Sequence, residues 1–328
     1  MIAMQEGIVV KLDRGYPLVQ LEDGTKVRCE HATSLVKKKT DRAVIGDRVK
    51  VDIPEGHEKG IIEAILPRRT RFVRKDPTER ALPQTLASNF DLVLIAQPID
   101  EVNFKRLERE LVLAHETGAS VAVVLTKADL LQEGAQFEET CAHVRALVGN
   151  DPVLIVSQND PASVESLARL IGEESKTAVL IGRSGVGKSS LVNLLVGEEL
   201  QRTTPVRESD GKGRHTTVSR EIIALPQGGF VVDMPGVRGL GLWDADEGIK
   251  AAFSEIEELA QQCKFRDCSH EHEQGCAVQA AVEEGTLAAE RLESYLRLKQ
   301  EYEEVQAKRV EAERLRTRRG HPRHRSGR

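Results

Sequence analysis

Residues 177–197 read TAVLIGRSGVGKSSLVNLLVG, and this stretch decides the fold. The apolar run TAVLI predicts a buried strand, and the spacing of apolar residues in SSLVNLLVG predicts a helix. Between them, Gly182, Gly187, Lys188 and Ser189 fill the pattern G-x-x-x-x-G-K-[ST]. Glycines let backbone N–H groups curl around an anion, and the following helix points its positive end at the same place. Strand, loop and helix together predict a phosphate-binding site in an α/β domain.

The residues of this loop are expected to divide the work of binding phosphates. Lys188 is expected to reach the β- and γ-phosphates and to act in catalysis, and the Ser189 hydroxyl is expected to ligate Mg²⁺. The residues of the loop expected to contact nucleotide are Gly182, Arg183, Ser184, Gly185, Val186, Gly187, Lys188, Ser189 and Ser190.

A second strand, GFVVDMPG at 229–236, ends in the pattern D-x-x-G. We expect Asp233 to hold Mg²⁺, directly or through water, and the Gly236 N–H to touch the γ-phosphate. The polar segment DGKGRHTTV lies between the two motifs, and its Thr216 or Thr217 is available for the metal and the γ-phosphate. An ordinary surface loop is the alternative interpretation of that segment.

The upstream stretch VLTKADLL, residues 124–131, is unusual because of its position. Its Thr126-Lys127-Ala128-Asp129 looks like the N-K-x-D loop with which GTPases read guanine, yet it precedes the phosphate-binding loop. Asp129 would pair with the guanine N1–H and N2–H groups, and Lys127 would lie along the base. In a parallel α/β sheet such loops meet at the carboxyl ends of the strands, so a circularly permuted domain keeps them together.

Apolar runs that alternate with helical stretches support a sheet of this kind. Continuous apolar strands between helices are typical of a parallel sheet covered on both faces. The runs are 92–96, 121–125, 153–156, 178–181 and 230–232. We place this α/β domain at residues 90–243.

The N-terminal part has a different sequence pattern from the α/β domain. Five short strand-like pieces separated by glycine- and charge-rich turns predict a small closed barrel at 1–67, with an OB-fold ahead of other small β-domains. Contact with RNA would use Lys37, Lys38 and Lys39. Residues 68–89 are interpreted as a basic linker, because they hold six Lys or Arg against two acids.

Residues 244–328 are expected to be helical around a metal site, with a charged helix running from about 282 into the tail. The candidate ligands are Cys263, Cys268, His270 and Cys276. Three thiolates and an imidazole close a tetrahedral zinc shell and leave no position for substrate, so the zinc would be structural. His272 is an alternative ligand. Seven arginines and no acid at 314–328 predict an arm for phosphate backbones, or else a solvated charge run.

Length and composition indicate several domains and a reducing compartment. The chain has 328 residues and a formal charge of −5, and three of its five cysteines fall within 263–276. That spacing suits a metal better than disulfides. The opening MIAMQEGIVV does not resemble a leader, and no run reaches the roughly 18 apolar residues of a membrane span. We expect a cytoplasmic protein with no membrane partner.

The order T-K-x-D, G-x-x-x-x-G-K-S, G-R-H-T-T and D-x-P-G resembles the RsgA (YjeQ) family of circularly permuted GTPases, over nearly the whole chain. The resemblance implies an α/β circularly permuted P-loop GTPase domain, preceded by an all-β OB-fold barrel and followed by a mainly helical zinc-binding domain. It implies hydrolysis of GTP to GDP and phosphate, with Mg²⁺ and one structural Zn²⁺ per chain. The implied partners are the 30S ribosomal subunit and 16S rRNA, with a role in late maturation and release after hydrolysis. We expect a monomer.

Two positions depart from the family pattern. Thr126 replaces the usual Asn, whose amide braces the site, and the change is expected to reduce nucleotide affinity. The next guanine-supporting loop, LIVSQND, carries Ser157-Gln158 in place of Ser-Ala, which leaves Ser157 as the candidate contact.

The group that activates water is the hardest to place. Many GTPases put a Gln directly after D-x-x-G to orient the attacking water, whereas this chain has Val237. His215, beside the two threonines, is the candidate catalytic residue, and a loop histidine without a catalytic part is the alternative. Two other functions stay open: an RNA-binding scaffold that uses nucleotide only for stability, and an ATPase with the same loop.

Overall fold

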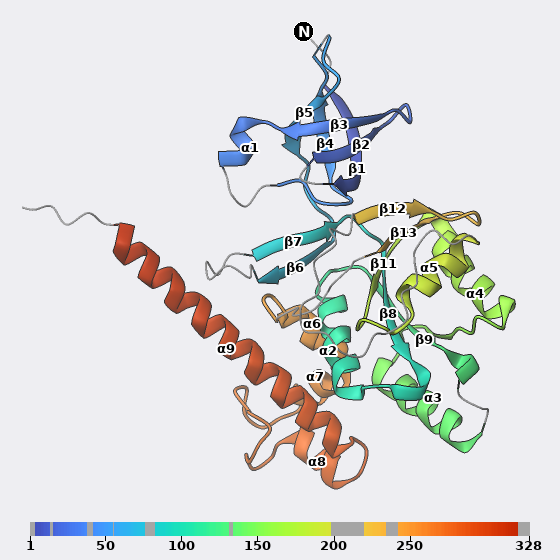
Figure 1. The fold of residues 1–328 in the computed structure, drawn as a ribbon. Helices are drawn as coiled ribbons and strands as arrows, with labels where there is room; N and C mark the ends of the chain where they lie inside the picture. The colour runs from blue at the N-terminus through green and yellow to red at the C-terminus, as the bar shows by residue number, and fades with distance from the viewer. Residues whose placement is uncertain are drawn as a thin grey trace, which may run out of the picture.

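The computed structural model describes residues 4–13, 16–37, 42–54, 56–75, 83–130, 134–197, 220–233 and 242–320. They form a barrel, a hairpin, an α/β sheet and a helical C-terminal part (Figure 1). Some residues singled out above lie outside the described ranges: Lys38, Lys39, His215, Thr216, Thr217, Gly236, Val237 and the end of the tail, 321–328.

Five strands and a short helix make up the N-terminal barrel. They are β1 (Gln5–Asp13), β2 (Tyr16–Leu21), β3 (Lys26–His31), α1 (Thr33–Lys37), β4 (Arg48–Asp52) and β5 (Gly60–Ile65). The strands pair in the order β1-β2-β3-β5-β4, and β4 pairs back to β1, which closes the sheet. Alternate side chains, among them Val9, Val19 and Ile62, fill the interior. The expected OB-like barrel is confirmed.

Two parts of the segment 68–89, where composition predicts a basic linker, form strands. β6 (Arg71–Lys75) and β7 (Pro83–Ser88) pair as an antiparallel two-stranded sheet. The buried Phe72 of β6 lies against Phe90, with ring centroids 5.9 Å apart. Charged residues dominate the composition of this segment, so the small apolar face that makes it a hairpin was missed.

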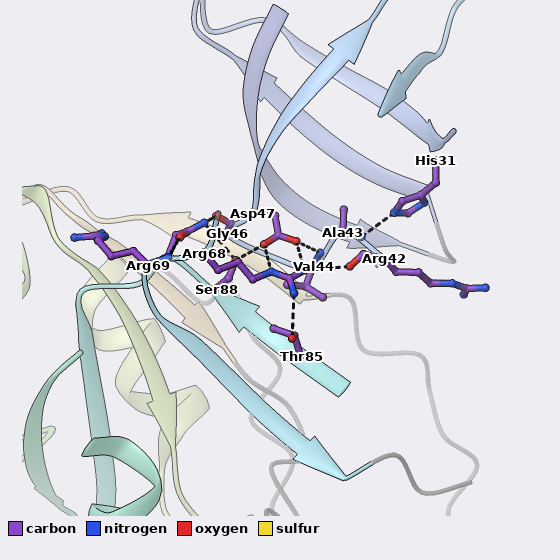
Figure 2. Close-up of polar contacts among 11 residues, drawn as sticks. His31, Arg42, Ala43, Val44, Gly46, Asp47, Arg68, Arg69, Thr85 and Ser88 are labelled. Carbon is purple, nitrogen blue, oxygen red and sulfur yellow. Dashed lines mark hydrogen bonds and ion pairs between the residues drawn. The ribbon is translucent and has the colours of Figure 1, made fainter. Parts of the chain in front are cut away.

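A buried carboxylate fastens the barrel to this hairpin (Figure 2). Asp47, 0% exposed, accepts hydrogen bonds from Arg68 Nε at 2.7 Å and Nη2 at 2.8 Å. It also accepts from the Ser88 hydroxyl at 2.5 Å and the Val44 N–H at 2.8 Å. At Gly46, where φ is +85°, a Cβ would lie 2.0 Å from the Ser88 carbonyl oxygen, so glycine allows this close approach. The barrel and hairpin therefore meet through a compensated buried charge.

Six strands form the sheet of the α/β part. They are β8 (Leu92–Pro98), β9 (Ser120–Thr126), β10 (Val153–Ile155), β11 (Thr177–Ile181), β12 (Arg220–Ala224) and β13 (Phe230–Asp233). Their order is β10-β9-β8-β11-β13-β12, with all neighbours parallel except β12, which runs antiparallel to β13. The expected parallel sheet is confirmed, and the antiparallel edge strand is an addition to it.

Helices cover both faces of this sheet. α2 (Phe104–His115) and α3 (Ala135–Val148) pack on the face that carries Val93 and Ile95. α4 (Pro161–Gly172) and α5 (Lys188–Val196) pack on the other face, which carries Leu92 and Leu94. Neighbouring residues of β8 thus point into different cores, which explains its uninterrupted apolar sequence.

The strand order brings the two nucleotide motifs to one edge of the sheet, although they occur in permuted order along the chain. The chain runs through β8, β9 and β10 to one edge of the sheet, then crosses back to β11 on the other side of β8. Strands β8 and β11 are therefore neighbours where the order reverses, the position at which open α/β sheets bind ligands. The T-K-x-D motif follows β9 and the phosphate motif follows β11, so both loops leave the same edge. The circularly permuted α/β fold is confirmed.

The barrel and the α/β sheet are joined through backbone. β1 pairs antiparallel with β12, with Lys11 opposite Glu221 and Leu12 opposite Arg220. The Lys11 ammonium lies 2.6 Å from the Glu221 carboxylate. The strands of both parts consequently form one 11-stranded sheet.

The C-terminal part contains α6 (Asp246–Ala252), α7 (Ser254–Ala260), α8 (Ala277–Glu283) and α9 (Ala289–Gly320). The charged helix expected from about 282 begins later, at Ala289, because α8 ends at Glu283 and Gly285 takes φ +73° in the turn between the two helices. α9 runs obliquely across the molecule and ends beyond the other elements (Figure 1). None of the helices in the described part of the chain is long and apolar enough to cross a bilayer.

Ion pairs hold α9 against α2. The Arg291 guanidinium, 8% exposed, bonds Glu108 at 3.1 Å and Glu255 at 2.7 Å. Nearer the middle of α9, Glu301 takes two bonds from Arg109, at 2.5 and 2.7 Å. The C-terminal part is therefore anchored directly on the α/β domain.

Candidate nucleotide site and metal centre

The loop between β11 and α5 has the backbone of an anion cradle. Gly182, Gly185 and Gly187 have φ values of +140°, +86° and +97°, which other residues rarely adopt. A Cβ on Gly182 would lie 2.5 Å from the Ala96 carbonyl oxygen, so the adjacent end of β8 requires glycine there. The loop leads directly into α5, whose N-terminus favours negative charge. This geometry suits a phosphate.

The cation and metal-binding positions of the motif lie at this loop. Lys188 Nζ donates to the carbonyl oxygens of Gly182 at 2.7 Å and Arg183 at 2.9 Å, so the side chain folds over its own loop. Ser189 follows it in the first turn of α5. β13 ends at Asp233, in register with Leu180 of β11, so the D-x-x-G motif begins beside the phosphate loop.

The candidate base-reading residues leave β9 at the same edge of the sheet. Lys127 adopts φ +59°, unusual for a residue other than glycine, and the turn carries the chain to Ala128 and Asp129. The two carboxylate oxygens of Asp129 accept from the Ser157 hydroxyl at 3.4 Å and from Gln158 Nε2 at 3.2 Å. The structure thus places the Ser157-Gln158 loop beside Asp129, and Gln158, a departure from the family pattern, supports the carboxylate.

Thr126 links the two loops. Its buried hydroxyl donates to the Val186 carbonyl oxygen of the phosphate loop at 2.5 Å and lies 3.3 Å from the Gln97 carbonyl oxygen. The Thr126 hydroxyl thus makes a brace of its own, and the reduced nucleotide affinity stays a prediction. This bond joins the base-reading loop to the phosphate loop.

Two buried polar residues behind the phosphate loop were missed in the sequence. Gln97, 3% exposed, donates from Nε2 to Glu110 Oε2 at 2.6 Å, and Arg106 Nε donates to Glu110 Oε1 at 2.9 Å. Burial raises the pKa of Glu110, and Arg106, Gln97 and the Lys188 charge act in the opposite direction. The available signals were a glutamine ending an apolar strand and a glutamate interrupting the apolar face of a helix.

The four candidate metal ligands meet in the C-terminal part. The ligand atoms of Cys263, Cys268, His270 and Cys276 all lie within 4.8 Å of one another. His270 Nδ1 is 3.6 Å from Cys263 Sγ and 3.5 Å from Cys276 Sγ, and these two sulfurs are 3.9 Å apart. Tetrahedral zinc, with bonds of about 2.3 Å to sulfur and about 2.0 Å to nitrogen, requires separations of about 3.5–3.8 Å. These three separations fit a tetrahedral metal ion, and Cys268 Sγ lies within 4.8 Å of the other ligand atoms.

The loop around His270 is built to present this ligand. The Glu273 carboxylate accepts the backbone N–H groups of Ser269 at 2.8 Å and His272 at 3.2 Å, and Gln279 Nε2 donates to the His270 carbonyl at 2.6 Å. Burial lowers the pKa of His270, which keeps its imidazole neutral, as a metal ligand must be. The side chain of His272 is exposed and is not among the clustered ligands.

Comparison with known proteins agrees with this geometry. The family model described as RsgA GTPase matches residues 65–243. The small ribosomal subunit biogenesis GTPase RsgA of Streptomyces coelicolor is 42% identical over 303 residues, covering 92% of this chain and 81% of that protein. The protein of the same name from Methanosarcina acetivorans is 40% identical over 281 residues, covering 83% of this chain and 75% of its own length.

Two solved structures share the fold. YjeQ from Thermotoga maritima aligns with a TM-score of 0.68 and 25% identity, covering 92% of this chain and 99% of that one. YloQ, described as a circularly permuted GTPase, aligns with a TM-score of 0.66 and 25% identity, covering 92% and 96%. With a family model matching more than half of its length and relatives at 40% identity or more across most of it, the chain belongs to the RsgA family of circularly permuted GTPases.

Proposed function

We propose that this GTPase binds GTP at the carboxyl edge of its α/β sheet, hydrolyses it to GDP and phosphate, and uses the cycle in late maturation of the small ribosomal subunit. The observation that carries the nucleotide assignment is the junction of the two loops by the Thr126–Val186 hydrogen bond. A phosphate loop alone suits many nucleotides, whereas Asp129 beside it favours guanine. The ribosomal part rests on the names of the relatives.

Each group in the proposed site has a role that its chemistry supports. Lys188 neutralises the β- and γ-phosphates, and the loop N–H groups surround them. Mg²⁺, when bound, would neutralise charge on the phosphate oxygens, and its ligands would be Ser189, Asp233 and Thr216 or Thr217. His215 is proposed to orient the attacking water, because Val237 offers no polar group for that task.

The metal of the C-terminal part is proposed to be one structural Zn²⁺ per chain. Three thiolates and a neutral imidazole gathered within 4.8 Å favour zinc over the harder cations. Elemental analysis should find about one zinc per chain, and Cys268→Ser should lower that content. Full zinc occupancy in the variant would point to another ligand set.

The proposed partners are the 30S subunit and its 16S rRNA, met by a monomer in the cytoplasm. α9 carries Arg314, Arg316, Arg318 and Arg319 on its last turns, and released counterions favour binding of such residues to RNA backbones. Loss of the γ-phosphate is proposed to lower affinity for the subunit and release the protein, an established mode of switching.

Phosphate release, measured with and without 30S subunits, tests the function. Wild type should be slow alone and faster with 30S. Lys188→Ala should show no turnover and weak nucleotide binding. His215→Ala should bind GTP normally and lose most of the stimulated rate, about 10²–10⁴-fold if the imidazole acts as a positioned base.

The same assay separates the alternatives. Turnover of ATP as efficient as that of GTP would favour an ATPase. Nucleotide binding without turnover, even with 30S subunits present, would favour a nucleotide-stabilised RNA-binding scaffold. Equal stimulation of wild type and His215→Ala would remove that histidine from the mechanism.

A further inference from the structure

A chain of polar contacts runs from helix α2 to the phosphate-binding loop. Arg106 donates to Glu110 at 2.9 Å, and Gln97 donates to the other Glu110 oxygen at 2.6 Å. The Gln97 carbonyl oxygen lies 3.3 Å from the Thr126 hydroxyl, which donates to Val186 at 2.5 Å. The chain therefore links a helix, two strand ends and the loop.

Packing does not explain a carboxylate at position 110. Glu110 is 6% exposed on the face of α2 that otherwise presents Leu107, Leu111 and Ala114 to the core. A buried carboxylate is costly even when paired, and an apolar side chain would serve the core equally well. Burial also raises the pKa of Glu110, so its charged form is disfavoured at this position. The acidic group is better explained by its hydrogen bond with Gln97.

Through Gln97, Glu110 is bonded to the end of β8. Gln97 pairs with Leu125, and Pro98 pairs with Thr126, at the last positions of the β8–β9 ladder. The preceding residue, Ala96, places its carbonyl oxygen 2.5 Å from where a Gly182 Cβ would lie. The end of β8 thus touches the phosphate loop at both ends of that loop, once directly and once through Thr126.

We propose that Glu110 is a positioning residue for the phosphate-binding loop. Through Gln97 and Thr126 it fixes the spacing between that loop and the guanine-reading residues, without touching nucleotide itself. A guanine nucleotide contacts both the phosphate-binding loop and the guanine-reading residues. A site in which the two are already at the right distance binds the nucleotide without first reorganising. The inference rests on the proposed nucleotide site.

The test is GDP affinity in single substitutions. Glu110→Leu removes the acceptor for the Gln97 amide and should weaken GDP binding roughly tenfold, the size of one lost hydrogen bond. Glu110→Gln keeps an oxygen for that amide and should bind within about twofold of wild type. If Glu110→Leu does not fold, the pair Gln97→Leu and Glu110→Leu removes both polar partners and should show the same tenfold loss.

Glu116→Leu is the matched control. Glu116 lies at the other end of α2, burial raises its pKa too, and it accepts the Gly248 N–H at 2.9 Å. Its partner belongs to α6, so GDP affinity should not change. A loss in this variant as large as in Glu110→Leu would show general damage to α2 and overturn the inference.

A double-mutant cycle with Thr126→Val tests the route. If Glu110 acts through Thr126, Glu110→Leu should weaken binding no further once the hydroxyl is gone. Additive losses, or a Glu110→Leu variant that binds like wild type, overturn the inference. Failure of the wild-type protein to bind GDP would instead overturn the proposed function.

Discussion

Asp129 holds hydrogen-bond donors on both carboxylate oxygens, from Ser157 and Gln158, at 3.4 and 3.2 Å. These long bonds orient the carboxylate while leaving it accessible at the edge of the sheet. Guanine offers N1–H and N2–H side by side, and a carboxylate accepts both, whereas an amide has a single acceptor oxygen.

Asp129→Asn should therefore weaken GTP binding by about 10–100-fold, the cost of losing a hydrogen bond to a charged group. It should also shift preference toward xanthine nucleotides, measured by competition against a fluorescent GDP. Asp160→Asn is the control, because Asp160 caps α4 and accepts the Ala162 N–H at 3.1 Å. Unchanged preference in Asp129→Asn would refute the base-reading role.

At the scale of residues, the motifs were predictable and their mutual contacts were not. Fixed spacing identifies the phosphate loop, T-K-x-D and the four metal ligands, because each set serves one chemical task within a short stretch. The Thr126–Val186 bond joins residues 60 positions apart. Glu110 obeys no spacing rule, since its role depends on a strand end that only the fold brings near it.

At the scale of elements, the junction of barrel and hairpin depends on Asp47. Asp47→Ala removes the acceptor that serves Arg68, Ser88 and the Val44 N–H. We expect a loss of about 3–5 kcal/mol in the free energy of unfolding, measured with urea.

The exposed Lys59–Glu30 pair of the barrel is the comparison for that variant. Glu30→Ala should leave the free energy of unfolding close to that of wild type, because solvent screens such pairs. Equal losses in the two variants would show that the Asp47 network contributes no more than a surface ion pair.

His31 gives the barrel a dependence on pH. Its Nε2 accepts the Ala43 N–H at 2.9 Å, which requires an unprotonated nitrogen. Burial and the Arg42 charge lower the pKa of His31, and Asp47 acts in the opposite direction. The unfolded chain then binds more protons between the lowered pKa and the ordinary value of about 6.5.

The contribution of His31 to the free energy of unfolding should consequently rise with pH through that window. It should be fully present above about pH 6.5 and lost as the pH falls through the folded-state pKa. Urea midpoints at about pH 5 and about pH 7.5 measure the slope. His31→Gln keeps an acceptor for Ala43 without a titrating group and should flatten the slope. An equal slope in that variant would assign the dependence to other groups.

Not every strand was predictable from the sequence, and the hairpin β6–β7 is an example. Periodicity identified the five barrel strands and the parallel strands, because each buries a repeated apolar pattern. β6 and β7 bury few apolar side chains between many charges, and β12 runs antiparallel at the edge of a parallel sheet. Their pairing is decided by neighbours distant in sequence.

At the scale of the molecule, the C-terminal part is coupled to the α/β domain through Arg291. Arg291→Ala leaves Glu108, 3% exposed, as a buried charge without this partner, and removes the guanidinium that stacks 4.0 Å over the Phe253 ring. We expect this substitution to lower the free energy of unfolding by about 3–5 kcal/mol. Hydrogen exchange should accelerate in α6 and α9 while the metal stays bound.

Lys105→Ala is the matched change, because Lys105 and Glu293 form an exposed pair across the same two helices at 3.9 Å. In Lys105→Ala, hydrogen exchange in α6 and α9 should stay close to that of wild type. If α9 keeps full protection without Arg291, apolar packing rather than the buried charges couples the two parts.

The pairing of β1 with β12 also has a consequence in time. Lys11 and Glu221 are 210 positions apart. At about 5–20 residues per second of translation, β1 is synthesised on the order of 10–40 s before its partner strand. The barrel closes through the pairing of β4 with β1 and of β5 with β3 and β4, so its last strand ends at Ile65 and β12 is not needed for that step. The nascent protein therefore begins as a separate barrel with an open edge at Lys11 and Leu12, and becomes one continuous body only when the strand that follows the nucleotide loops is synthesised.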